Sequence, residues 1–345
     1  MLVVLEKNAS ENDIQILVEQ IESLGFKAQM IPGSFRTAIG VLGDKNYEIA
    51  SALGRFPGVK EIIRVTKPYK LVSREFKNED TIIKVGGHEI GKDFIVMAGP
   101  CSVESEEQIM TVAEGVKKAG AHILRGGAFK PRTTPYAFQG LGLEGLKLLK
   151  KAKIRFGLPI VTELLHVKNI DVVAEYTDII QIGARNMQNF EMLQEVGKLK
   201  KPILLKRGLA ARMDEFLLAA EYILNAGNPN VILCERGIRT FETATRNTLD
   251  LNIVALIKQV SHLPIITDPS HASGISSLVT PLSLASYAVG AHGLILEVHP
   301  EPQKALSDGQ QSLDLKSFSD LMKKLSHYQN VLGKKVILEI TAEFL

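Results

Sequence analysis

The chain of 345 residues is poor in several features that would point to particular classes of protein. Its two cysteines are too few for a disulfide framework in a chain of this length. A formal net charge of only +3 argues against nucleic acid as a partner, so any basic cluster is a local site. Neither a signal peptide nor a membrane span is visible, because charged residues soon follow Leu2–Leu5. We therefore expect a soluble, cytoplasmic protein without a membrane partner.

The first part of the chain, residues 1–66, is predicted to form a small domain of its own. Strand-like and helical segments follow one another there in the order βαββαβ, which is typical of a split-βαβ, ferredoxin-like fold. These segments are Leu2–Leu5, Glu11–Leu24, Lys27–Ile31, Thr37–Leu42, Tyr47–Arg55 and Lys60–Val65. Residues 67–92 then read as a charged linker and a β-hairpin that turns at Gly86-Gly87.

In residues 93–345, short continuous apolar runs alternate with helical segments, as expected of strands buried on both faces. Eight strands, each followed by a helix, predict an α/β fold of the (β/α)8 or TIM-barrel type. A doubly wound sheet is the alternative, but no G-x-G-x-x-G follows directly on a strand to support dinucleotide binding. The expected strands are Phe94–Ala98, His122–Leu124, Pro159–Thr162, Ile179–Ile182, Pro202–Leu205, Val231–Cys234, Pro264–Thr267 and Gly293–Leu296. Clear helices are Glu106–Ala119, Leu143–Phe156, Met213–Ala226 and Leu282–Val289, and a strand-like Val336–Ile340 has no place in such a barrel.

A basic cluster, Arg125–Thr134, follows the second of these strands. Arginine offers a planar fork and lysine a movable point charge, so the cluster suits a phosphate or a carboxylate. Gly126 and Gly127 allow the backbone to approach such a ligand closely. A solvated basic loop would explain the charges, but neither the glycines nor the position at a strand end.

The other strands also end in polar residues, and in a barrel all these ends face the mouth where active sites are built. Arg or Lys occurs at four of them, which indicates an anionic substrate. Cys101, His271 and Glu297 come from different strand ends, and Asp308 follows the eighth strand. Such donors suit a divalent Mn, Fe, Co or Zn ion. Each residue alone fits a packed cysteine or a hydrogen-bonded histidine equally well, and no C-x-x-C or H-x-x-H supports a metal locally.

Seven short motifs occur in order along the chain. They are Ala98-Gly-Pro-Cys101-Ser, Lys130-Pro-Arg132-Thr-Thr134, Gly183-Ala-Arg185, Lys206-Arg-Gly208, Glu235-Arg236-Gly, Asp268-Pro-Ser-His271 and Glu297-Val-His299. Together they resemble the motifs of the 3-deoxy-D-arabino-heptulosonate 7-phosphate (DAHP) synthase family, in the form with an N-terminal ferredoxin-like regulatory domain. The resemblance covers essentially the whole chain.

This resemblance implies a transferase of the shikimate pathway, a 3-deoxy-7-phosphoheptulonate synthase that joins phosphoenolpyruvate to erythrose 4-phosphate and releases phosphate. It implies a divalent metal bound by Cys101, His271, Glu297 and Asp308. Phosphoenolpyruvate would be bound by Arg125, Lys130, Glu163, Ala184, Arg185, Lys206 and Arg236. Erythrose 4-phosphate would be bound by Pro131, Arg132, Thr133 and Thr134.

The catalytic residues implied are Lys130 and the metal ligands Cys101 and His271. We expect Lys130 to deliver a proton near the developing alkoxide, because it sits among other cations and like charges lower the pKa of a lysine. Arg185 and Lys206 would hold the leaving phosphate.

Two alternatives stay open. A sister family makes 3-deoxy-manno-octulosonate 8-phosphate from arabinose 5-phosphate, but typically has Ala-Asn-Arg-Ser-Ser after the lysine, where this chain has Pro131–Thr134. The second alternative is a non-catalytic binding or sensor protein on the same scaffold, although none of the expected metal-binding residues and no expected lysine is missing. For residues 1–66, the resemblance implies feedback inhibition by tyrosine or phenylalanine and assembly as a homotetramer.

Overall fold

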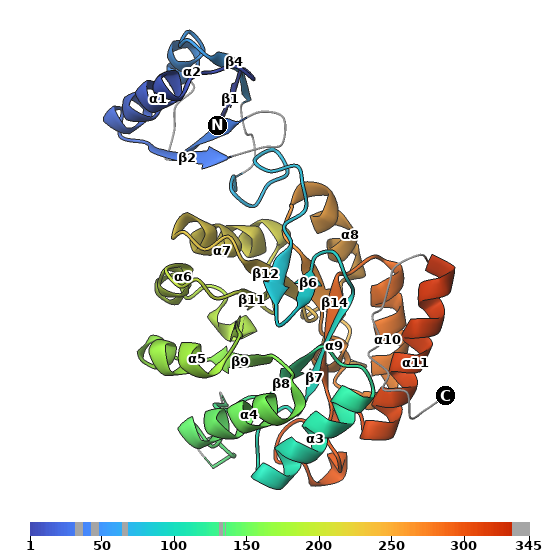
Figure 1. Ribbon diagram of the computed structural model, residues 1–345. Coiled ribbons are helices and arrows are strands. Elements are labelled where there is room, and N and C mark those ends of the chain that lie inside the picture. The colour runs from blue at the N-terminus through green and yellow to red at the C-terminus, as the bar shows by residue number, and fades with distance from the viewer. Residues whose placement is uncertain (32–36, 43–47, 64–67, 131–133, 135, 333–345) are drawn as a thin grey trace. The chain divides into compact units, whose positions relative to one another are not determined.

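The computed structural model describes residues 1–31, 37–42, 48–63, 68–130, 134 and 136–332 (Figure 1). The chain divides into two compact units. One comprises Met1–Asp80 with Gln259–His262, and the other Thr81–Lys258 with Leu263–Leu345. Each unit contains a sheet and a hydrophobic core of its own. Among the residues that the structure describes, none of the helices could cross a lipid bilayer.

The first unit contains a four-stranded antiparallel sheet with the strand order β2-β3-β1-β4. Ser10 precedes helix α1 (Glu11–Ser23), and its side chain accepts a hydrogen bond from the Asp13 amide and so caps the helix. Leu17 and Ile21 of α1 share one core with Val3 of the sheet. The predicted ferredoxin-like order is confirmed by β1 (Leu2–Leu5), α1 (Glu11–Ser23), β2 (Lys27–Ile31), β3 (Ala38–Leu42), α2 (Glu48–Leu53) and β4 (Val59–Ile63).

The second unit contains the predicted closed barrel of eight parallel strands. Each strand pairs with the next along the chain, and β14 pairs with β7 to close the ring. Six of the eight strands run one or two residues beyond their predicted ends, so that Glu235 and Glu297, among others, belong to the sheet itself. The strands are β7 (Ile95–Gly99), β8 (Ile123–Arg125), β9 (Ile160–Leu164), β10 (Ile179–Ile182), β11 (Ile203–Lys206), β12 (Val231–Glu235), β13 (Ile265–Thr267) and β14 (Gly293–Glu297).

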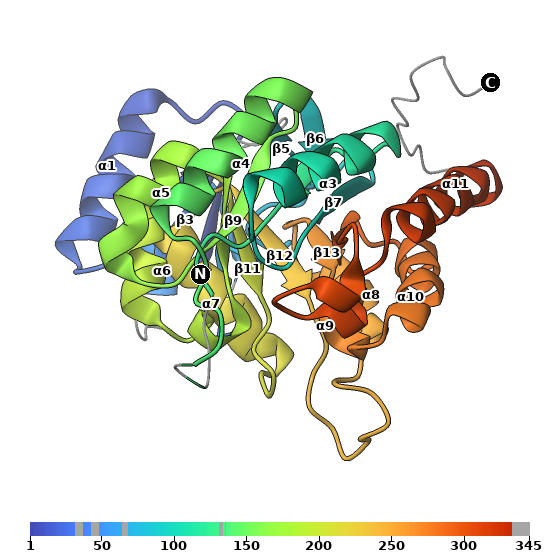
Figure 2. The same cartoon turned by 90° about the horizontal axis from the view of Figure 1, so that it is seen from below.

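Helices follow these strands and surround the barrel (Figure 2). Helix α4 has its predicted bounds, whereas α10 begins at Ser276 instead of Leu282. Pro281 lies inside α10, a position where proline is unusual and obscures the start of a helix in the sequence. The predicted strand Val336–Ile340 lies outside the described residues. The helices are α3 (Glu106–Lys118), α4 (Leu143–Phe156), α5 (Ile170–Tyr176), α6 (Phe190–Gly197), α7 (Met213–Asn225), α8 (Leu251–Val260), α9 (Pro269–Ser273), α10 (Ser276–Ala288) and α11 (Leu315–Leu332).

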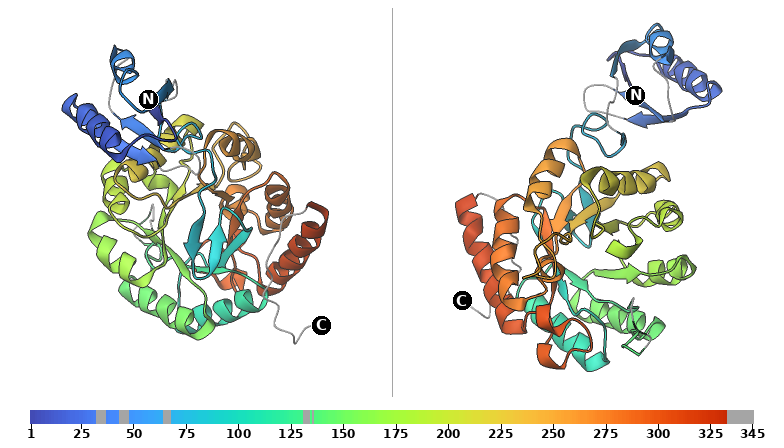
Figure 3. Two further views of the ribbon diagram at one scale, coloured as in Figure 1. Left: turned by 45° about the horizontal axis from the view of Figure 1, so that its top comes forward. Right: turned by 180° about the vertical axis from the view of Figure 1, so that it is seen from behind.

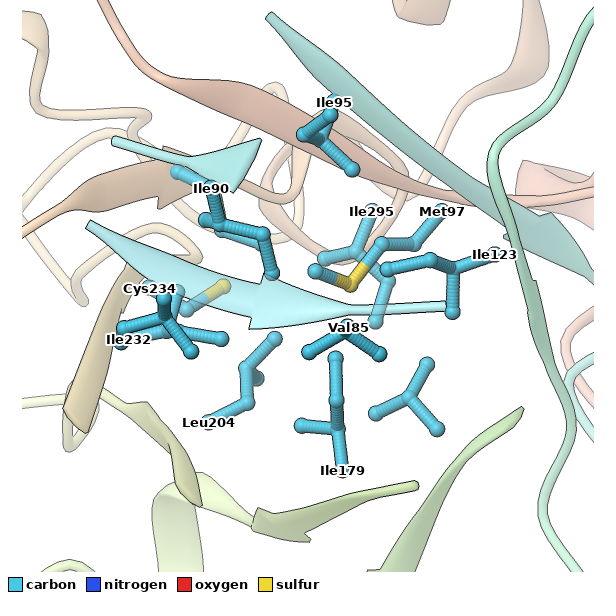
Figure 4. Packing of buried hydrophobic residues seen from close by; sticks show 13 residues of the cluster. Val85, Ile90, Ile95, Met97, Ile123, Ile179, Leu204, Ile232, Cys234 and Ile295 are labelled. Atoms are coloured by element: carbon cyan, nitrogen blue, oxygen red, sulfur yellow. The ribbon is translucent and has the colours of Figure 1, made fainter. Parts of the chain in front are cut away.

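The predicted β-hairpin, β5 (Ile83–Val85) and β6 (His88–Ile90), packs into the barrel interior. It appears in cyan at the centre of the ring of helices in the left view of Figure 3. Its apolar side chains share a core with inward-facing residues near the beginnings of the strands, such as Ile95, Ile123 and Ile179 (Figure 4). The hairpin therefore fills the end of the barrel opposite to the strand carboxyl ends.

The hairpin turn offers a test of this packing. Gly86 and Gly87 both have positive φ, 55° and 87°, so alanine costs about 1 kcal/mol in backbone conformation at either position. Only at Gly86 would an added Cβ clash, 2.1 Å from Pro159 Cγ, whereas the space around Gly87 is open. We expect Gly86→Ala to lower the free energy of unfolding by about 1–3 kcal/mol more than Gly87→Ala. Equal destabilisation in urea titrations would show that the hairpin does not pack as described.

Candidate active site

The carboxyl ends of the eight strands meet at one end of the barrel, because all the strands run in the same direction. A cavity of about 230 Å³ lies there. His271 and Asp308, two of the predicted metal ligands, line it. So do all the residues predicted to bind phosphoenolpyruvate, namely Arg125, Lys130, Glu163, Ala184, Arg185, Lys206 and Arg236. Residues from motifs far apart in the sequence thus lie together in space.

Most of the positive charge of the cavity wall lies below the protein surface. A buried charge costs free energy unless it is paired or hydrogen-bonded. Arg125 Nη1 donates to Glu297 Oε1 over 2.7 Å, and Lys206 Nζ lies 2.5 Å from Asp268 Oδ2. The cations of the cavity wall that are at most 9% exposed are Arg125, Lys130, Lys206 and Arg236.

Two of these buried cations donate to backbone carbonyl groups. Lys130 Nζ donates to the Cys101 carbonyl over 3.0 Å, and the Arg236 guanidinium donates to the carbonyls of Gly237 and His271 over 3.2 and 3.3 Å. A carbonyl oxygen satisfies a donor but does not neutralise a cation. The cavity therefore favours an anionic ligand, such as a phosphate or a carboxylate.

Three of the four predicted metal ligands form a compact group. One ligand atom each of Cys101, Glu297 and Asp308 lies within 4.8 Å of the others. His271 meets this group at Glu297, because its Nε2 is 3.3 Å from Glu297 Oε1. Cys101 Sγ lies 3.2 Å from Asp308 Oδ2 and 3.1 Å from Ser307 Oγ. A thiol, an imidazole and two carboxylates gathered in this way fit a divalent first-row metal ion.

Further polar residues, which no sequence pattern singled out, hold these side chains in place. Gln311 Nε2 donates to Glu297 Oε2 over 2.6 Å. Arg246 Nη1 donates to Gln311 Oε1 over 2.8 Å and lies 3.4 Å from Asp308 Oδ1. Asp308 itself has a φ of 52°, a left-handed conformation that is uncommon for a residue other than glycine. The contacts of Arg246 join residues 62 and 65 positions apart in the chain, so no local motif could have revealed them.

The charges around Glu297 and Cys101 act in opposite directions on the two groups. Burial would raise the pKa of Glu297, but His271, Arg125 and Lys130 outweigh burial and lower this pKa to about 2. Burial, and then the Glu297 carboxylate, raise the pKa of the Cys101 thiol to about 12. The protein alone thus keeps Cys101 protonated, and a bound cation would supply the positive charge that a thiolate needs.

The pKa of Lys130 differs from our expectation. The cations around this lysine in the sequence predict a lowered pKa. Burial and Arg125 do act in that direction, but Cys101, Glu163 and Glu297 outweigh them, and the pKa is raised. The prediction was wrong because the carboxylates that face Lys130 belong to strand ends far away in the sequence.

Some strand-end residues do not face the cavity. Arg207 Nη1 lies 2.9 Å from Glu235 Oε2 and 3.0 Å from Asp250 Oδ2, in a buried cluster outside the cavity wall. This corrects the expectation that all the polar strand ends point to the mouth. Of the predicted erythrose 4-phosphate segment, Pro131–Thr133 lies outside the described residues. Thr134 is exposed, and its hydroxyl accepts a hydrogen bond from the Tyr136 amide over 3.4 Å.

Two family models match the chain. The model of the DAHP synthetase I family matches residues 76–332, and that of the DAHP synthase ferredoxin-like domain matches residues 1–67. The chain belongs to the DAHP synthetase I family. This membership confirms the predicted family, and the predicted enzyme class agrees with the relatives described next.

Similar proteins support the same family. The chain is 53% identical over 337 residues to the phospho-2-dehydro-3-deoxyheptonate aldolase of Thermotoga maritima. The aligned residues cover 97% of this chain and 100% of that protein. The crystal structure of phospho-2-dehydro-3-deoxyheptonate aldolase (DAHP synthase) from Thermotoga maritima matches with a TM-score of 0.78 and 52% identity, over 97% of this chain and 99% of that one. A 2-dehydro-3-deoxyphosphooctonate aldolase of Geobacter sulfurreducens is more distant, with 30% identity over 70% of this chain and 96% of the length of that protein.

The donor group allows a direct test of metal binding. We expect Co²⁺ to produce a thiolate-to-metal absorption band in the near ultraviolet, because a cysteine bound to Co²⁺ is deprotonated. Cys101→Ala should abolish this band. Cys234→Ala is the matched control, since Cys234 lies in the barrel core and should leave the band unchanged. A band that survives in the Cys101 variant would place the metal elsewhere.

Proposed function

We propose that the chain catalyses the metal-dependent condensation of phosphoenolpyruvate with erythrose 4-phosphate, giving DAHP and phosphate. The observation that carries the proposal is the meeting of four buried cations with a thiol, an imidazole and carboxylates around one cavity. Two phosphorylated substrates account for the positive charge, and an aldehyde accounts for the metal donors. The name of the Thermotoga maritima relative agrees with this product.

The cations of the cavity would bind and orient phosphoenolpyruvate. We assign Arg236 to its carboxylate, and Arg185 and Lys206 to its phosphate. Holding two anionic substrates together opposes their mutual repulsion, so each of these cations should contribute to the rate. The carboxylates near the donor group do not cancel this role, because Arg125 and Lys206 can exchange a protein carboxylate for a substrate anion.

The chemical step joins the enol carbon of phosphoenolpyruvate to the aldehyde carbon of the sugar phosphate. Water adds to the adjacent carbon, and the resulting phosphate hemiketal expels phosphate. Cys101, His271, Glu297 and Asp308 would hold the divalent metal, which supplies a Lewis acid at the aldehyde oxygen. Lys130 would give a proton to the developing alkoxide, and its raised pKa means that it carries that proton at neutral pH.

The assay that tests this function follows the ultraviolet absorbance of phosphoenolpyruvate in parallel with erythrose 4-phosphate and arabinose 5-phosphate. We expect loss of absorbance with erythrose 4-phosphate, no loss after treatment with a chelator, and recovery on addition of Mn²⁺. Preference for arabinose 5-phosphate would assign the chain the activity of the sister family instead. Metal-loaded, folded protein that consumes phosphoenolpyruvate with neither sugar would contradict the proposal.

For the domain organisation we propose residues 1–66 as a regulatory domain, 67–92 as linker and hairpin, and 93–345 as the catalytic barrel. The ferredoxin-like match at residues 1–67 supports the first of these. We further propose that tyrosine or phenylalanine inhibits the enzyme through residues 1–66, and that the enzyme acts in the cytoplasm as a homotetramer.

Removing residues 1–66 should leave the condensation activity intact and abolish inhibition by tyrosine or phenylalanine. The physical reason is that the cavity and its donor group are built from residues of the second unit alone. Initial rates of full-length and truncated enzyme, measured over a series of effector concentrations, provide the comparison. A truncated enzyme that is still inhibited would place the effector site in the barrel.

A further inference from the structure

Three cations of the cavity wall each contact a residue of the metal-donor group or its immediate support. Arg125 donates to Glu297 over 2.7 Å, and Lys130 donates to the backbone carbonyl of Cys101 over 3.0 Å. Lys206 makes the corresponding contact indirectly, through Asp268. Arg125 thus pairs with a carboxylate of the donor group, and Lys206 pairs with the carboxylate beside His271.

Asp268 lies between a cation of the cavity wall, Lys206, and a predicted metal ligand, His271. Its carboxylate is almost fully buried, 1% exposed, between β13 and α9. Oδ1 accepts the His271 amide over 3.0 Å and so fixes the carboxylate at the start of α9. Oδ2 lies 2.5 Å from Lys206 Nζ and 2.7 Å from His271 Nδ1, so that one oxygen atom is shared by two partners.

The sharing is unequal. Lys206 Nζ makes a hydrogen bond to Oδ2, whereas His271 Nδ1 is buried close to the same oxygen but has no hydrogen bond of good geometry. The other ring nitrogen, Nε2, points to Glu297 in the donor group. A histidine that binds a metal through one nitrogen usually donates its other N–H to a carboxylate, which orients the ring and strengthens its donor atom. The carboxylate of Asp268 lies beside His271 Nδ1, but Lys206 Nζ competes for the same oxygen atom.

We propose that Asp268 is a positioning residue that makes the binding of phosphoenolpyruvate and the binding of the divalent metal strengthen each other. The inference rests on the proposed function. An anion that draws Lys206 toward itself leaves Asp268 Oδ2 free to align with His271 Nδ1, and Nε2 then becomes a better metal ligand. Linkage requires the reverse effect to be equally large.

The pair of Arg125 and Glu297 acts in the same direction. When Glu297 binds a cation, its hold on Arg125 weakens, and the guanidinium becomes available to a phosphate or a carboxylate. Both connections thus replace a pair within the protein by two pairs with ligands. When only one ligand binds, it breaks such a pair within the protein but gives a new partner to only one of the two charged groups.

The test measures the dissociation constant of Mn²⁺ with and without phosphoenolpyruvate, from the electron paramagnetic resonance signal of free Mn²⁺, in the full-length protein. Asp268→Asn keeps the shape of the side chain but removes its charge. Asp178→Asn is the matched control. Asp178 also pairs with a lysine, Lys153 at 2.6 Å, and accepts a backbone amide, that of Ile160 at 2.8 Å, but it lies at the other end of the strands.

We expect phosphoenolpyruvate to tighten Mn²⁺ binding about tenfold in the wild-type protein and in Asp178→Asn. In Asp268→Asn, Mn²⁺ should bind about 10- to 100-fold more weakly, and phosphoenolpyruvate should tighten its binding by less than about fivefold, because only the coupling through Arg125 and Glu297 is left. The wild-type comparison tests the coupling even if the Asp268 variant does not fold. Circular dichroism of each variant shows whether it has folded.

Three outcomes would overturn the inference. One is that phosphoenolpyruvate binds to the wild-type protein without changing the affinity for Mn²⁺. Another is that folded Asp268→Asn keeps the full coupling, which would assign it to other residues. In both, the proposed function can still stand, because the two ligands bind. If equilibrium dialysis detects no binding of phosphoenolpyruvate with or without Mn²⁺, the proposed function and the inference fail together.

Discussion

The barrel mouth depends on the pairing of buried positive charge with buried carboxylates. Arg125 with Glu297 and Lys206 with Asp268 are nearly inaccessible to water, and an unpaired charge in such a place would cost several kcal/mol. The carboxylates that a metal site requires therefore also stabilise the cations that an anion site requires. Arg125 and Lys206 are thus paired within the protein, whereas Lys130 and Arg236 donate to carbonyl groups, which do not neutralise them.

The closed barrel makes this pairing geometrically possible. Eight parallel strands bring residues from every part of the second unit to one end, while the hairpin β5–β6 fills the other end with apolar side chains. A second buried cluster, Arg207 with Glu235 and Asp250, ties the end of β11 to β12 and to the segment before α8. The neighbouring residues Lys206 and Arg236 line the cavity. Neighbouring residues at the strand ends thus either line the cavity or pack behind it.

Much of the fold and part of the site could be predicted from the sequence. Continuous apolar runs marked all eight barrel strands because parallel strands are buried on both faces. Cys101, Glu297 and Asp308 could be grouped from the sequence as candidate metal ligands, because active sites of this fold lie at the strand ends, and their ligand atoms do lie within 4.8 Å of one another. Gln311 could not be found in this way, because its role comes from one hydrogen bond across the loop after β14.

The order of residues along the chain by itself determined the two units, the strand succession and the kinds of side chain at each strand end. These features depend on local periodicity and on residue type, which the sequence contains directly. Only the tertiary structure decided which charges face one another. In the folded protein, Arg207 lies in a buried cluster of charged residues and the pKa of Lys130 is raised, not lowered. Asp268 lies between Lys206 and His271. Electrostatic effects depend on distance and burial, and both are set by strands that lie far apart in the sequence.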